Sequence, residues 1–145
     1  METPRATVIL IRHADTDGGT ATTTALNAAG LARAETLRRV LADAGIAVIF
    51  VSSTRRSQQT AELLAGDLHI VPEVIGGDDL VATVAPIVAA IGALPADSTA
   101  LVVGHSNTVG RIIGELGGPA IPSITTFDNL YVLTGNRLTH LHYGA

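Results

Sequence analysis

Polar residues suited to chemistry on an anion stand at three places in this sequence: Arg12-His13, Ser53 to Arg56, and His105-Ser106-Asn107. A neutral imidazole is a competent nucleophile at pH 7, and guanidinium groups bind phosphate oxygens through paired hydrogen bonds. Phosphoryl transfer requires mainly in-line positioning and compensation of the charge on the equatorial oxygens. Two guanidinium groups and a second imidazole can supply that compensation without a metal ion. These residue types therefore favour phosphate chemistry.

The elements that must position these groups are buried strands. Three apolar, β-branched runs predict such strands, at residues 7–11, 47–51 and 99–104. Arg12 and His13 follow the first of these strands, Ser53 to Arg56 follow the second, and His105 to Asn107 follow the third. A parallel sheet brings the carboxyl ends of its strands to one edge, which is where ligands of α/β sandwiches bind. We therefore expect the polar side chains at these strand ends to lie close together.

Helices are predicted between the strands by apolar spacings of three and four, at 27–44, 54–64, 80–91 and 107–116. Further strands are expected at 68–71 and in a terminal hairpin, 130–133 and 138–141. The expected helical core includes Leu63, Leu64, Ile87, Val88 and Ile91. The alternation predicts one domain over residues 1–145, a three-layer α/β/α sandwich with a mostly parallel sheet and an antiparallel C-terminal edge hairpin.

Composition narrows the possible functions. The 145 residues include no cysteine, which excludes disulfides, thiolate metal sites and cysteine nucleophiles. The net charge is −4 and the nine basic residues are all arginine, which argues against a nucleic-acid surface. No apolar run approaches the roughly 18 residues that span a bilayer, and residues 1–5 show no signal-peptide pattern. We expect a cytoplasmic protein without membrane or nucleic-acid partners.

Four segments resemble the sequence blocks of the histidine phosphatase superfamily, which has the phosphoglycerate mutase-like fold. They correspond to its Arg-His-Gly signature, its Leu-Thr-x-x-Gly helix entry, its Ser-Ser-Pro-x-x-Arg block and its second histidine motif. In chain order they are Leu10–Ala14, Leu26–Ala34, Ser52–Ala61 and Val102–Ser106. Each segment alone is weak evidence for the family, but the four occur in the family's order at predicted strand ends or helix starts, and together they are strong evidence.

The resemblance implies a role for each matching residue. His13 corresponds to the nucleophile that accepts the phosphoryl group, and no metal or other cofactor is implied. The groups expected to hold the phosphoryl oxygens are Arg12, Arg56, His105 and Ser106. Counted from the Gln-Thr-Ala anchor, Arg55 falls on a variable position and should face solvent. The implied substrate is a phosphorylated small molecule or a phosphoprotein, and too little chain lies between 60 and 99 for the cap of a mutase.

The sequence departs from the family pattern at three places. Ala14 replaces the signature glycine, and Asp15 stands where glutamate is common, either to orient His13 or to cap a turn. The family's general acid closes a Glu-Leu-x-Glu-like segment, and Gly76 takes its place here. The remaining candidates for a proton donor are Glu73, Asp78 and Asp79. This loss resembles the small phosphohistidine phosphatases of the family, which also lack a large cap.

Three other interpretations compete. Asp15-Thr16-Asp17 after a strand imitates the Asp-x-Asp motif of Mg-dependent haloacid dehalogenase-like phosphatases, although that reading leaves His105 unexplained. The sequence around Ser106 imitates a hydrolase nucleophile elbow, but Thr108 breaks the motif. The missing acid also fits a non-catalytic module that binds a phosphoanion or phosphoprotein. His140 and His142 alternate along the last strand and are expected to form a surface face.

Overall fold

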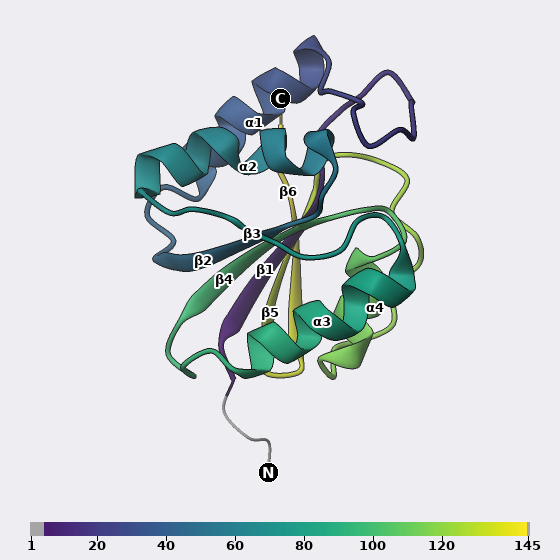
Figure 1. Ribbon diagram of the computed structural model, residues 1–145. Helices are drawn as coiled ribbons and strands as arrows, with labels where there is room; N and C mark the ends of the chain where they lie inside the picture. Colours follow the sequence, from purple (N-terminus) through teal and green to yellow (C-terminus); the bar gives the residue numbers. More distant parts are fainter. Residues whose placement is uncertain (1–4, 145) are drawn as a thin grey trace.

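A six-stranded sheet forms the middle layer of the protein, in a computed structural model that describes residues 5–144 (Figure 1). The strands are β1 (Thr7–Arg12), β2 (Ile46–Val51), β3 (Glu73–Val74), β4 (Thr99–Gly104), β5 (Asn129–Thr134) and β6 (Arg137–His142). The helices are α1 (Ala28–Val40), α2 (Arg55–Leu68), α3 (Leu80–Gly92) and α4 (Val109–Glu115). Among residues 5–144 no helix has the length and apolarity needed to cross a membrane. The expectation of no signal peptide rests largely on residues 1–4, which lie outside the described part.

The strand order is β3-β2-β4-β1-β5-β6. The first four strands are parallel, and β1 pairs with β4 from Thr7 opposite Thr99 to Arg12 opposite Gly104. Strand β5 runs antiparallel to β1 and forms the terminal hairpin with β6. The predicted fold class is confirmed, and the carboxyl ends of β2, β4 and β1 lie side by side.

The alternating faces of the central strands build two cores. Leu10, Val102 and their neighbours pack under α3 and α4, whereas Ile11, Val103 and theirs pack under α1 and α2. Figure 1 shows these helix pairs on opposite faces of the sheet. Because both faces of β1 and β4 are covered, their side chains are almost entirely apolar, and polar groups appear only where the strands end.

The strand predicted at 68–71 is wrong, and so is the end predicted for the preceding helix. Helix α2 continues through Gly66 to Leu68 and ends at His69, whose left-handed backbone (φ 55°) caps the helix with a hydrogen bond to Ala65 O. The third strand, β3, lies further on. A single glycine inside a helix costs about 1 kcal/mol, which packing of Leu64 and Ala65 on the sheet offsets.

Two expectations about helix packing also need correction. Helix α1 ends at Val40 rather than residue 44, and its buried face consists of Gly30, Ala34 and Leu37. Leu63 was expected in the core but is 37% exposed. It lies on the outer face of α2, one residue before the fully buried Leu64. Adjacent apolar residues on a helix point in directions about 100° apart, so only one of this pair can face the sheet.

Candidate active site

A cleft of about 380 Å³ opens at the carboxyl ends of β1, β2 and β4. Its lining includes all five residues proposed from the sequence for the nucleophile and the phosphate site: Arg12, His13, Arg56, His105 and Ser106. The remaining lining residues are Thr16, Gly18, Gly19, Thr20, Asp78, Asn107 and Phe127. The structure therefore brings together five predicted residues that lie up to 94 positions apart in the sequence.

His13 is fixed by its own backbone and by the neighbouring strand. Its backbone N–H donates to Gly104 O at 2.9 Å, and its Nδ1 lies 2.8 Å from Ala14 O. A carbonyl only accepts, so Nδ1 carries the proton and Nε2 keeps its lone pair. Burial, with further contributions from Arg12 and Arg56, lowers the pKa of His13 to about 4. The imidazole is therefore neutral and nucleophilic at pH 7.

Residues of the family-like segments contact the backbone that follows His13. The Ala14 N–H donates to Thr60 Oγ1 at 2.8 Å, and Thr60 in turn donates to Arg56 O. The Asn27 N–H donates to Asp15 O at 3.0 Å. Gly30 passes so close to the Asp15 backbone that any Cβ would collide with it. These segments therefore act mainly by shaping the loop that presents His13.

Asp15 takes part in neither of the roles expected for it. Its Oδ1 accepts from Arg33 Nε at 2.6 Å, and both side chains are largely buried. Asp15 does not line the cleft. The carboxylate that the haloacid dehalogenase-like interpretation requires is therefore paired with Arg33 and lies outside the cleft lining. Among residues 5–144 no group of three or more histidine, aspartate or glutamate side chains could hold a metal ion.

Arg56 enters the cleft from the first turn of α2. Thr54 caps this helix by accepting from Ser57 N, which sets the direction in which the first turn projects. Arg56 is 4% exposed, donates from Nη1 to Ala21 O at 2.9 Å and lies 3.4 Å from Asp78 Oδ2. Arg55 is exposed on the outside of the helix, as predicted from the register.

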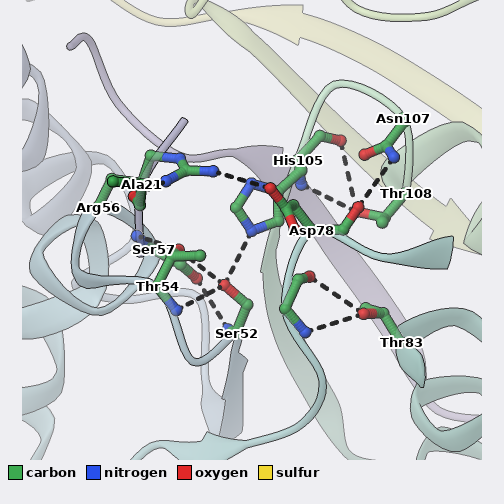
Figure 2. A network of polar contacts seen from close by, with 11 residues as sticks. Ala21, Ser52, Thr54, Arg56, Ser57, Asp78, Thr83, His105, Asn107 and Thr108 are labelled. Atoms are coloured by element: carbon green, nitrogen blue, oxygen red, sulfur yellow. Dashed lines mark hydrogen bonds and ion pairs between the residues drawn. The ribbon is translucent and has the colours of Figure 1, made fainter. Parts of the chain in front are cut away.

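His105 is held by a hydroxyl network at the start of α2 (Figure 2). Its ring nitrogen Nε2 lies 2.8 Å from Ser52 Oγ, which is 2.9 Å from Thr54 Oγ1. Ser57 Oγ links the same helix end to Val103 O on β4. Burial, followed by the nearby His13 and Arg56, lowers the pKa of His105 to about 3. The ring centroids of the two imidazoles lie 5.2 Å apart, and the ring planes are tilted by 60°.

Arg12 is supported differently, by an aromatic ring. Its guanidinium carbon lies 4.1 Å from the centroid of Phe127, a geometry in which the cation is attracted to the ring face. Among the described residues its guanidinium makes one hydrogen bond, a long one of 3.5 Å from Nη1 to Thr126 O, and its Nε is buried without a partner. Burial and the positive charge of Arg56 lower the pKa of Arg12.

The three candidate proton donors have different positions. Gly76 has φ +64°, and a Cβ there would collide with Thr83 Oγ1 and Ala82 O, so this position admits no acidic side chain. Asp78 lines the cleft beside Arg56. Asp79 caps α3 through Val81 N, and Glu73 is exposed on β3; neither lines the cleft. Of the three carboxylates, only Asp78 borders the reacting groups.

Two supporting residues, Ser52 and Phe127, and one loop that lines the cleft were not predicted from the sequence. Ser52 belongs to a motif segment but has no predicted role of its own, and nothing in the sequence around Phe127 distinguishes it. The polar loop at 16–20 also lines the cleft, and its Gly and Thr content was the only available signal. His140 and His142 lie outside the cleft on β6, bonded to Asn129 and Asp128 respectively, as a surface face.

Fold and site together define a class, the phosphate-transferring α/β proteins with histidines and arginines at the carboxyl edge of the sheet. The model of the histidine phosphatase superfamily (branch 1) matches residues 8–76, which contain three of the four motif segments. The chain is similar to this superfamily over that segment, which is slightly less than half of its length. No curated protein sequence matches it significantly.

Solved structures of the same fold cover nearly the whole chain. The protein histidine phosphatase SixA, complexed with tungstate, has a TM-score of 0.74 and 22% identity over 96% of both chains. A protein assigned as SixA from Nakamurella multipartitia has a TM-score of 0.71 and 25% identity over 99% of both chains. A mycobacterial glucosyl-3-phosphoglycerate phosphatase has a TM-score of 0.71 and 18% identity over 97% of this chain and 99% of that chain.

Proposed function

We propose that this protein is a metal-independent phosphatase that acts through a covalent phosphohistidine on His13. The observation that carries the proposal is the hydrogen bond from His13 Nδ1 to Ala14 O, at 2.8 Å. It directs the lone pair to Nε2 in a cleft that also contains two guanidinium groups and a second imidazole. Guanidinium groups supply positive charge to the phosphoryl oxygens, which is the contribution that a metal ion makes elsewhere.

In the first step, His13 Nε2 attacks phosphorus and the bond to the leaving group breaks. The leaving group departs with the bonding electron pair and takes up a proton. Arg12 and Arg56 pair with the equatorial oxygens, whose charge is greatest in the transition state. His105 accepts from the Ser52 hydroxyl through Nε2, which leaves its Nδ1–H free to donate to a phosphoryl oxygen.

In the second step, water attacks the phosphorus of the phosphohistidine and the P–N bond breaks. The electron pair of that bond returns to Nε2 of His13, and the water proton is released with inorganic phosphate. The imidazole is then neutral again, as its low pKa favours. No cap covers the cleft in the described chain, so water can reach the intermediate, which favours hydrolysis over return of the phosphoryl group to a substrate.

A non-catalytic module that binds phosphoanions is the second candidate, and one observation favours it. The position of the family acid is closed by Gly76, while Asp78 is an ion-pair partner of Arg56. The Asp78 carboxylate is thereby engaged as an acceptor from Arg56 Nη2. The same observation favours substrates whose leaving groups depart without protonation. Such substrates include small aryl phosphates, anhydrides and phosphohistidine.

Rapid-quench labelling with a ³²P-labelled aryl phosphate tests the proposal. We expect an acid-labile, base-stable adduct on the peptide that contains His13, and its absence in His13→Ala. EDTA should leave both labelling and turnover unchanged. Label on Asp15 would support the haloacid dehalogenase-like mechanism instead. Tight phosphate binding without any label would support the binding module.

A further inference from the structure

A second hollow adjoins the active-site cleft along α4. Its volume is about 360 Å³, and it shares the wall formed by Ser106 and Asn107 with the cleft. Asn107 Nδ2 donates to the backbone oxygen of Asp78 at 2.9 Å, so Asn107 is held on the rim between the two hollows (Figure 2). A substrate whose phosphoryl group lies in the cleft can therefore extend directly into the second hollow.

The walls of this hollow fit an apolar body. Leu80, Ile121 and Pro122 line it opposite the exposed side of α4. Gly114 of α4 also lines it, and a Cβ at Gly114 would meet no atom within 4 Å. A larger residue there would fill the hollow without disturbing the packing of the helix. The missing side chain of Gly114 therefore leaves space that the fold does not use.

Two charged side chains of α4, one basic and one acidic, line the hollow. Arg111 and Glu115 both line it, and both are exposed. Arg111 precedes Glu115 by four residues of α4, about one helical turn or roughly 6 Å, and is therefore closer to the end of the helix that follows Asn107. Within residues 5–144 Arg111 forms no ion pair, even with Glu115. A substrate extending from the cleft would thus meet an available guanidinium group before it met the carboxylate.

We propose that this second hollow is a leaving-group site, in which Arg111 pairs with a second anion on the substrate. The inference rests on the proposed function and adds a substrate class to it. The preferred substrates are phosphate compounds whose leaving group has an apolar body and a carboxylate or second phosphate. A small phosphoester and a phosphorylated peptide with a nearby acidic side chain share this chemistry.

Binding of two non-hydrolysable phosphonates tests the proposal independently of turnover. The probes are benzylphosphonates with a para-carboxylate or a para-carboxamide, which differ in charge but hardly in shape. In the unchanged protein, calorimetry should give a Kd about three- to fivefold lower for the carboxylate, the size expected of one partly exposed ion pair. In Arg111→Gln the two Kd values should become equal. Arg39→Gln removes an exposed arginine of α1 and should preserve the difference.

A second pair of variants tests the apolar part of the site. Gly114→Leu should weaken the binding of both phosphonates, because the leucine side chain would occupy the space they need. The helix itself should tolerate the change, since leucine has a higher helix propensity than glycine. Gly92→Leu, at an equally open position of α3, should change neither Kd. Binding of inorganic phosphate, which needs only the cleft, reports whether the cleft is intact in each variant. Phosphopeptides with Asp or Asn beside the phosphorylated residue then distinguish a protein substrate from a small one.

The outcomes separate the two proposals. A carboxylate preference that persists in Arg111→Gln, or one lost equally in Arg39→Gln, overturns the leaving-group site. Unweakened binding in Gly114→Leu does the same. Absence of a His13 adduct, with the carboxylate preference intact and dependent on Arg111, overturns the proposed catalysis and leaves the leaving-group site standing.

Discussion

The two halves of the cleft are supported by different interactions. On the side of β2 and β4, His105 and Arg56 are fixed by several hydrogen bonds, to Ser52, Ala21 and Asp78. On the side of β1, Arg12 rests on the ring of Phe127 with one long hydrogen bond. The groups of both halves stand at strand ends, yet the side chains of His105 and Arg56 have shorter and more numerous hydrogen bonds than the side chain of Arg12. Adjacent strands therefore ensure that groups meet, while the surrounding side chains decide how firmly each is held.

The largest effect should come from His13, the proposed nucleophile between the two halves. His13→Ala should lower kcat by at least about 10³-fold, since no other group of the cleft can form the same intermediate. Steady-state kinetics with an aryl phosphate measures the loss. His69→Ala, an exposed histidine at the end of α2, is the control and should retain full turnover. Comparable losses in both would show that His13 acts only structurally.

Arg56→Ala should come next, with a loss on the order of 10²-fold in turnover, by analogy with removing one preorganised donor. Arg55→Ala is the matched control, because the two arginines are adjacent in α2 but Arg55 is exposed outside the cleft. We expect a loss of less than about twofold for Arg55→Ala. Equal losses for the pair would mean that the register assigned to α2 does not determine function.

Acid should destabilise the protein through both histidines. The folded pKa values, about 4 for His13 and about 3 for His105, lie below the ordinary 6.5. Between pH 6.5 and about 4 the unfolded chain takes up protons that the folded chain does not. The stability is therefore complete above pH 6.5 and falls by about 1.4 kcal/mol per pH unit per histidine below it.

Urea unfolding at pH 7, 6, 5 and 4.5 measures this loss. His105→Asn should reduce the slope of unfolding free energy against pH, whereas the exposed His69→Asn should leave it unchanged. An unaltered slope in His105→Asn would show that other groups cause the acid sensitivity.

Phe127 provides the sharpest test of the less bonded half. Phe127→Leu keeps an apolar side chain but removes the ring face, which is worth about 0.5–2 kcal/mol to a nearby cation. We expect kcat/KM to fall about two- to thirtyfold and Phe127→Tyr to restore most of it. Since Arg12 binds the phosphoryl oxygens in the proposed mechanism, the loss should include a higher KM. If leucine and tyrosine behave alike, packing rather than the cation–π contact positions Arg12.

The smallest effect is expected at Asp78. If it pairs with Arg56 and donates no proton, Asp78→Asn should change turnover of an aryl phosphate by less than about twofold. Rates across a series of phosphates should rise steeply as the pKa of the leaving group falls, because general acid help of about 10²- to 10⁴-fold is absent. A flat series that becomes steep in Asp78→Asn would identify Asp78 as the proton donor.

The sequence by itself determined the fold class and which groups gather at the carboxyl edge. Buried strands such as β1 and β4 are encoded by continuous apolar runs, and Thr54 encodes the start of α2 through a local capping hydrogen bond. Both signals depend on neighbours within a few residues, so they can be read without knowing the rest of the chain.

Only the tertiary structure decided how those groups are supported. The pairing of Asp15 with Arg33, the ring of Phe127 under Arg12 and the collision that closes position 76 each join residues from different segments. The end of α2 likewise depended on packing against the sheet, which outweighed the local signal of Gly66. Such contacts leave no periodic pattern along the chain, because they form only when the layers pack together.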